Sequence, residues 1–228
     1  MKLKLSRFFV LVLCLILSLS CFAFVGCNNE SSTSNDSASL NAAATGDNWQ
    51  KYLNKDINST ADKANIQGYN GWYYVCGKPG SLERMVFNND SGRWCSRYQQ
   101  LYYYTYIWDV WFPDGQTGQG IGMTFKAPAS GKMTITVKLK LLCDTTNLTS
   151  NGVTFRTTSV TGGTEYSNLC YSFTQSNKAQ YNQLITIQDT NVKLGKDEEI
   201  VFLLYAVSGN NTTYTSVDIN VKYTGAYL

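Results

Sequence analysis

The strongest constraint on the fold is a stretch at residues 132–141 in which apolar and polar side chains alternate without interruption. Successive side chains of a β-strand point to opposite faces of a sheet, so this period of two predicts a strand with one buried and one solvated face. The apolar set is Met133, Ile135, Val137, Leu139 and Leu141, and the polar set is Lys132, Thr134, Thr136, Lys138 and Lys140.

Strand-like patterns recur along the rest of the chain. Residues 217–223 repeat the alternation, and residues 200–207 form a continuous apolar run that predicts a strand buried on both faces. Shorter apolar runs lie at residues 72–76, 153–155 and 184–187, and clusters of Gly, Asn, Asp and Ser separate these segments. Many short strands with turn signals between them predict an all-β fold, an antiparallel β-sandwich or jelly roll.

The N-terminus has the three parts of a secretory signal. Basic residues lie at the start, residues 8–26 carry no charge and are mostly apolar, and the small residue Gly26 precedes Cys27. This pattern predicts export of everything downstream. Two alternatives remain open: ordinary secretion without acylation, and an uncleaved apolar segment of about 19 residues that spans the bilayer.

The Gly26–Cys27 junction resembles the lipobox of bacterial lipoproteins of the Gram-positive type, although Phe24 stands where Leu is usual. The resemblance implies that a diacylglyceryl group is attached to the sulfur of Cys27 and that the chain is cleaved before this residue. We therefore expect a signal peptide at residues 1–26 and an extracytoplasmic protein at the cell surface, lipid-anchored in the cell membrane.

Composition divides the remainder of the chain into a tether and a domain. Residues 27–47 are rich in Ser, Asn, Ala and Thr and contain no aromatic residue, which predicts a flexible tether. Residues 48–228 hold all 5 Trp and all 16 Tyr, and a segment of this length suffices for one domain. We expect the β-sandwich to occupy residues 48–228.

Charge argues against a nucleic-acid partner. The whole chain has a net charge of +3, from 19 basic and 16 acidic residues, but three of the bases and none of the acids lie in the first 26 residues. The exported chain is therefore neutral, whereas nucleic-acid binding requires a strong basic excess.

Cysteine usage fits an exported domain. Cys76, Cys95, Cys143 and Cys170 allow three pairings. We expect the disulfides Cys76–Cys95 and Cys143–Cys170, each closing a loop of about 20–30 residues, with four buried thiols as the alternative. The chain has no His and no C-x-x-C pair, so we expect no zinc site and no bound metal.

The lack of His also removes the Ser-His-Asp and Cys-His nucleophilic systems. Carboxylate-pair chemistry of the glycosidase kind stays open, with Asp109, Asp114, Glu83 and Glu165 as candidates, but any chain with 16 acids offers such pairs. We therefore expect a protein that is not an enzyme and needs no cofactor. A structural Ca²⁺ is an alternative, with candidate oxygen ligands at Asp109, Asp197, Glu198, Glu199 and Asp218.

Aromatic residues concentrate at residues 69–125. Consecutive aromatics of a strand point to opposite faces, so one set can fill the core while the other lies on a surface. Exposed rings suit stacking on the C–H face of a pyranose. The candidate carbohydrate-binding residues are Trp72, Tyr74, Trp94, Tyr104, Trp108 and Trp111.

Five blocks of the chain form one further pattern; they lie at residues 67–74, 111–113, 125–132, 151–153 and 192–200. Together they resemble β-sandwich carbohydrate-binding modules of secreted polysaccharide-using proteins. The resemblance implies a surface that binds a polysaccharide or other glycan, and with the lipobox it implies a tethered, non-catalytic glycan-binding lipoprotein. A structural or adhesive envelope protein that binds another protein is the alternative.

Anchoring through Cys27 can be tested by substitution. We expect Cys27→Ser to release the protein into the medium or to stall its processing, because a diacylated cysteine holds a protein firmly in the membrane. Cell fractionation measures the change, and Cys21→Ser, in the apolar run, is the matched control that leaves anchoring intact. An unmodified mature N-terminus at another residue, found by mass spectrometry, contradicts the prediction.

Overall fold

The computed structural model describes residues 48–53, 55–95, 100–102, 107–110, 119–142, 152–206 and 213–227. These residues form two antiparallel sheets and four short 3₁₀ helices. In this part of the chain, no helix is long and apolar enough to cross a bilayer.

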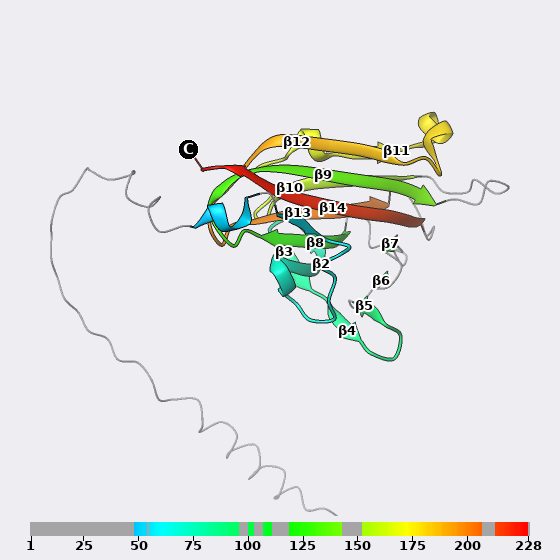
Figure 1. The fold of residues 1–228 in the computed structure, drawn as a ribbon. Helices are drawn as coiled ribbons and strands as arrows, with labels where there is room; N and C mark the ends of the chain where they lie inside the picture. The colour runs from blue at the N-terminus through cyan, green and yellow to red at the C-terminus, as the bar shows by residue number, and fades with distance from the viewer. Residues whose placement is uncertain are drawn as a thin grey trace, which may run out of the picture. The chain divides into compact units, whose positions relative to one another are not determined.

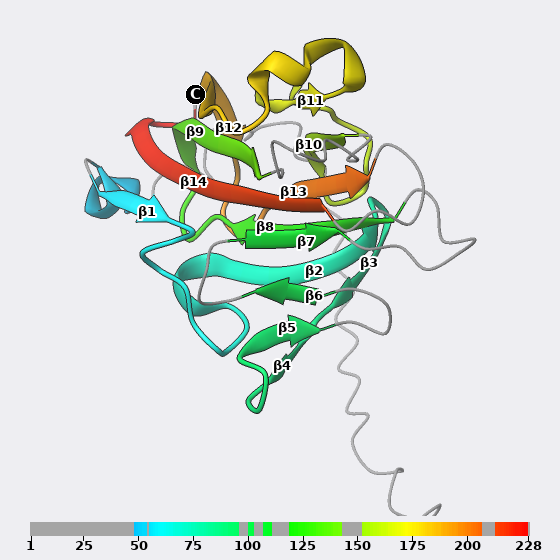
Figure 2. The ribbon, with the colours of Figure 1, turned by 90° about the vertical axis from the view of Figure 1, so that its right-hand side faces the viewer.

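The larger sheet, sheet A, has the strand order β12-β9-β14-β7-β6-β5-β4, and β1 also pairs with β14. Figure 2 looks onto this ladder, in which β4, β5, β6, β7, β14 and β9 follow one another across the view. Its strands are β1 (Asp56–Asn58), β4 (Val86–Asn88), β5 (Arg93–Cys95), β6 (Gln100–Tyr102), β7 (Ile107–Val110), β9 (Gly131–Leu142), β12 (Ile185–Leu194) and β14 (Thr213–Gly225).

The second sheet, sheet B, has the strand order β11-β10-β13-β8-β2-β3. Figure 1 shows its long strand β13 aligned along nearly the same line as the antiparallel strands β9 and β14 of sheet A. Its strands are β2 (Trp72–Lys78), β3 (Ser81–Arg84), β8 (Gly120–Lys126), β10 (Val153–Ser159), β11 (Tyr171–Phe173) and β13 (Glu199–Ala206). The 3₁₀ helices are η1 (Trp49–Tyr52), η2 (Tyr69–Gly71), η3 (Ser167–Leu169) and η4 (Gln175–Gln180). The predicted all-β, antiparallel sandwich is confirmed.

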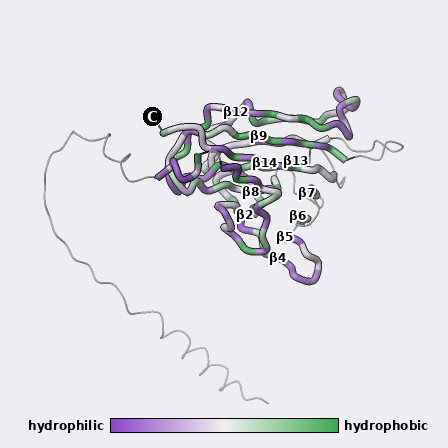
Figure 3. Tube along the Cα trace, viewed as in Figure 1, coloured by the Kyte–Doolittle hydropathy of each residue, from purple (hydrophilic) through white to green (hydrophobic). Residues whose placement is uncertain are grey.

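The alternation predicted at residues 132–141 is confirmed in β9. All five apolar side chains of this stretch are fully buried, whereas the Lys and Thr side chains between them are at least partly exposed. The neighbouring strand β14 is in the same phase, since Ile219 pairs with Val137 and Val221 with Ile135. Figure 3 shows the resulting alternation of hydrophobic and hydrophilic residues along β9.

Strand β13 is buried on both faces over residues 200–204, as its apolar run predicts. Its inward side chains join the main core between the sheets. Val201 and Leu203 point to the opposite face of sheet B, where they pack with Val75 in a second, small cluster. The burial ends at Tyr205 and Ala206, which are partly exposed.

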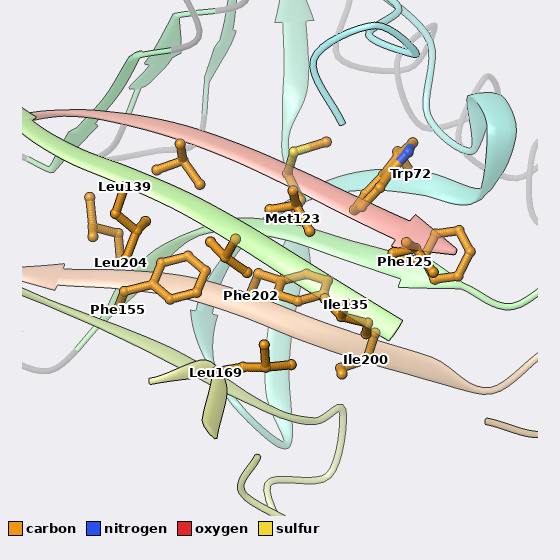
Figure 4. Packing of buried hydrophobic residues seen from close by; sticks show 14 of the residues in the cluster. Trp72, Met123, Phe125, Ile135, Leu139, Phe155, Leu169, Ile200, Phe202 and Leu204 are labelled. Carbon is orange, nitrogen blue, oxygen red and sulfur yellow. The ribbon is translucent and has the colours of Figure 1, made fainter. Parts of the chain in front are cut away.

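Aromatic rings fill much of the main core (Figure 4). The ring centroid of Trp72 lies 5.1 Å from that of Phe125 and 6.2 Å from that of Phe202. Trp94 stacks on Tyr74 with centroids 4.2 Å apart. These contacts join β2 and β8 of sheet B to β5 of sheet A.

Replacement of Trp72 tests the assignment of this ring to the core. We expect Trp72→Ala to destabilise the fold by about 3–5 kcal/mol, because a fully buried large ring leaves a cavity when it is removed. Urea unfolding measures the loss, and Tyr214→Ala, at a 41 % exposed ring, should change stability by less than about 0.5 kcal/mol. Equal stability of Trp72→Ala and the wild type would place this ring outside the core.

Candidate functional site

The structure places three of the predicted carbohydrate-binding rings in the core. Trp72, Tyr74 and Trp94 are 1 %, 3 % and 2 % exposed, so the prediction that they form an exposed stacking surface is wrong. They are buried because the inward phase of β2 carries Trp72 and Tyr74, and Trp94 of β5 closes over Tyr74. Trp108 lies in β7, but the structure does not describe its side chain. Tyr104 and Trp111 lie outside the described residues.

The predicted disulfides are also wrong, because Cys76, Cys95 and Cys170 are thiols. Cys76 lies in sheet B and Cys95 in sheet A, and each sulfur contacts a nearby backbone carbonyl instead, at 4.0 Å from Glu83 O and 3.8 Å from Arg93 O. Cys143, the predicted partner of Cys170, lies outside the described residues.

Several of the candidate calcium and catalytic carboxylates have cationic or amide partners. Glu199 pairs with Arg84 at 3.0 Å and Asp197 with Lys126 at 2.9 Å. Asp218 accepts a 2.8 Å hydrogen bond from the side chain of Asn58. Within the described ranges, no three acidic or cysteine side chains gather as metal ligands. Asp109 lies in β7 with its side chain outside the description, and Asp114 lies outside the described residues.

A groove of about 680 Å³ opens on the outer face of sheet B. Its floor comes from β10, β11 and the end of β13, and one wall is the turn between β2 and β3. The groove is lined by Lys78, Pro79, Thr154, Arg156, Glu165, Cys170, Ser172, Tyr205 and Ala206.

The wall stands because two turns dock on each other. The backbone N–H of Gly80 donates a 2.7 Å hydrogen bond to the carbonyl of Val160. Gly162 lies so close to Pro79 that an added Cβ would be 2.8 Å from the proline Cβ, and its φ of +76° also favours glycine. The β2–β3 turn is thereby fixed against the turn that follows β10, and it lines the groove together with Tyr205 and Ala206 at the end of β13.

Strand phase and register bring the floor residues together. The side chains of Thr154 and Arg156 point outward because Val153 and Phe155 beside them are buried. Thr154 pairs across the sheet with Tyr205 on one side and Ser172 on the other. The floor therefore presents a phenol ring, two hydroxyls and a guanidinium in adjacent positions on three hydrogen-bonded strands.

Tyr205 lies over a gap in the side chains of β8. An added Cβ at Gly120 would be 2.9 Å from the Tyr205 Cζ, so the ring is packed directly on the backbone of this strand. The ring is only partly exposed, and burial raises the pKa of Tyr205 to about 12. It provides a fixed, neutral aromatic plate at one end of the groove.

The polar groups of the groove bond to one another. Arg156 Nη2 donates to Glu165 Oε2 at 3.1 Å, and the hydroxyls of Thr154 and Ser172 lie 3.0 Å apart. Cys170 Sγ donates to Glu165 Oε1 at 3.5 Å, and burial raises the pKa of this thiol, so it is neutral at physiological pH. Glu165 is thus the acceptor in a network that Arg156 neutralises.

A smaller pocket of about 380 Å³ lies beside η2, next to Asp62 and Asn70. Both carboxylate oxygens of Asp62 are occupied, by the backbone N–H of Asn58 at 2.8 Å and the side chain of Asn70 at 2.9 Å. The aromatic residue of this pocket, Tyr52, is partly exposed and packs on Tyr223 with centroids 5.5 Å apart.

No family model and no curated protein matches this chain. Several solved structures do. A CBM35 module of Abf62 from Cellvibrio japonicus is 15 % identical and covers 75 % of this chain and 99 % of its own, with a TM-score of 0.32. CsCBM6-3 from Clostridium stercorarium, solved with cellobiose, is 11 % identical and covers 75 % and 94 %, with a TM-score of 0.30. The module CBM6cm-2 of lichenase 5A from Cellvibrio mixtus, solved with cellotriose, is 15 % identical and covers 53 % and 88 %, with a TM-score of 0.27.

The packing of Tyr205 can be tested by titration. A pKa of about 12 lies above the ordinary value near 10, so the folded state favours the neutral phenol. The burial of the neutral Tyr205 phenol therefore contributes fully to the free energy of unfolding below pH 10, and this contribution is lost as the pH rises from 10 towards 12. The ultraviolet difference titration between wild type and Tyr205→Phe should show one phenol ionising near pH 12. Ionisation near pH 10 would show a fully solvated ring.

Proposed function

We propose that this protein is a non-catalytic, glycan-binding lipoprotein tethered to the outer side of the cell membrane, and that the groove on sheet B holds the glycan. The observation that carries the proposal is the ring of Tyr205, fixed on the backbone of β8 beside a floor of hydroxyl and charged groups. This site replaces the exposed rings that the sequence predicted.

The groove has the size and chemistry that a short glycan requires. About 680 Å³ lies within the range typical of small-ligand sites. A pyranose has an apolar C–H face, which can stack on Tyr205, and a rim of hydroxyls. The hydroxyls of Thr154 and Ser172 can donate or accept, whereas Arg156 donates and Glu165 accepts. Such neighbouring donors and acceptors can bind adjacent sugar hydroxyls.

The same residues argue against catalysis. Carboxylate-pair hydrolysis requires two acids on either side of the bond that is cleaved. Among the described residues lining the groove, Glu165 is the one carboxylate, and it is paired with Arg156. The chain has no His to serve as general base. Binding without turnover is the function that this arrangement supports best.

A protein-binding adhesive role is the second candidate. It is favoured by the burial of Trp72, Tyr74 and Trp94, since a chain that uses its aromatics for packing has fewer rings for stacking on sugar. The two functions differ in whether Tyr205 is needed for binding.

Substitution of Tyr205 tests the glycan site. A glycan array with the mature chain in a sugar-free detergent should identify a ligand. We expect a dissociation constant in the micromolar to millimolar range, which corresponds to a binding free energy on the order of −4 to −8 kcal/mol. We expect Tyr205→Ala to weaken binding at least about tenfold, which is about 1.4 kcal/mol, because the stacking plate is lost. Tyr205→Phe keeps the plate and should bind within about threefold of wild type.

The matched control is Tyr214→Ala, which removes a 41 % exposed tyrosine from β14 of sheet A and should leave binding unchanged. Each variant is checked by its melting temperature. Wild-type affinity in a folded Tyr205→Ala protein would exclude this groove, and the absence of any glycan ligand on the array would favour the adhesive role.

A further inference from the structure

The outer face of sheet A differs in charge from the outer face of sheet B. Five lysines occupy it on three adjacent strands. Their side chains point away from the core because the residues beside them, such as Met133, Leu139 and Val221, are fully buried. We call this surface the lysine face; it consists of Lys132, Lys138 and Lys140 on β9, Lys193 on β12 and Lys222 on β14.

None of these five lysines has a carboxylate within ion-pair distance among the described residues. The ion pairs found there, Arg84–Glu199, Lys126–Asp197 and Arg156–Glu165, all join cations carried by strands of sheet B to carboxylates. Three cations on strands of sheet B are thus neutralised by ion pairs, whereas no described carboxylate neutralises the five lysines of the lysine face in this way.

Among the side chains that the structure describes, two acids lie on the lysine face, and they do not offset it. Asp218 pairs in register with Lys138, but its carboxylate accepts a 2.8 Å hydrogen bond from Asn58. Asp56 pairs in register with Lys222 and forms no ion pair with it. Two carboxylates against five ammonium groups leave a net positive surface on a chain that is neutral once its first 26 residues are removed.

The lysines form an array that extends in two dimensions. Lys132 and Lys140 are about 27 Å apart along β9 at about 3.4 Å per residue, and the three strands together span about 10 Å. Apart from Asp218 and Asp56, the side chains between the lysines are neutral and shorter than lysine, so the ammonium groups reach furthest from the sheet; Gln188 also lies among them, beside Thr136. The other neutral neighbours include Thr134, Thr136, Thr186, Ser216 and Asn220.

We infer that the lysine face rests on an anionic lipid bilayer, the same membrane that holds the chain by its lipid anchor. The inference rests on the anchoring part of the proposed function. A bilayer with anionic headgroups presents a planar negative potential that attracts nearby lysines, which matches a flat array better than a single polymer chain does. A tether of the kind that the sequence predicts for residues 27–47 would keep the domain within about 25 Å of the membrane on average.

This orientation has a direct consequence for the groove. The outer faces of the two sheets of a sandwich point in opposite directions. With the lysine face towards the membrane, the groove beside Tyr205 faces away from it and is open to a glycan approaching from outside.

Lysine acetylation of the mature chain in vesicles tests the inference. One sample uses phosphatidylcholine, and the other adds phosphatidylglycerol; modification at each lysine is followed by mass spectrometry. We expect the five lysines of the lysine face to react at least about fivefold more slowly with the anionic vesicles at low salt. The difference should disappear at about 1 M salt, where the screening length falls to about 3 Å. Lys78, which is exposed in the groove, is the internal control and should react equally in both.

Two results overturn the inference. Equal reaction rates of the lysine face in both vesicle types exclude contact with anionic lipid. Equal or stronger protection by soluble polygalacturonate, with phosphatidylcholine vesicles, assigns the face to an acidic polymer instead. A vesicle flotation assay tests the lipid anchor independently, because a protein without an anchor does not float with phosphatidylcholine vesicles. In that case the sample with phosphatidylglycerol still tests whether the lysine face binds anionic lipid. The double variant Lys138→Gln/Lys140→Gln should lose protection at the remaining lysines, whereas Lys78→Gln should not.

Discussion

Burial of the apolar side of β9 is the contact on which the rest of the structure depends. Five side chains of this strand are removed from water together, and β12 and β14 take their register from it. A slip of one residue would exchange the buried and solvated sets of all three strands. The same contact therefore fixes the core, the pairing of sheet A and the position of every lysine on its outer face.

The long strands could be predicted because each carries a periodic signal over many residues. Strict alternation identified β9 and β14, and a continuous apolar run identified β13, whose outer side is covered by Val75 and its neighbours. The strands β3, β4 and β5 have three or four residues each, too few for any period to be recognised. Their place at one end of the sheets follows from tertiary contacts such as the stacking of Trp94 on Tyr74.

The groove could not be predicted from local patterns, because its residues come from distant parts of the chain. Lys78 and Tyr205 meet only after β2, β10 and β13 have assembled. The density of aromatics at residues 69–125 led to the prediction that Trp72 and Trp94 bind sugar. Large rings bury the most apolar area, however, and both side chains lie in the core. A signal for the groove was present in Gly120 and Gly122, which leave two successive outward positions of β8 without a side chain next to an outward tyrosine.

The docking of one turn on another has an evolutionary consequence. The wall of the groove is held by contacts between Pro79–Gly80 and the turn at residues 160–162, and neither turn contributes to the main core. Val160 packs on the small cluster of Val75, Val201 and Leu203, but exchanges at the other positions of these turns alter the width of the groove without disturbing either cluster. Ligand preference can therefore diverge among descendants of this chain at little cost in stability, while the two sheets beneath stay the same.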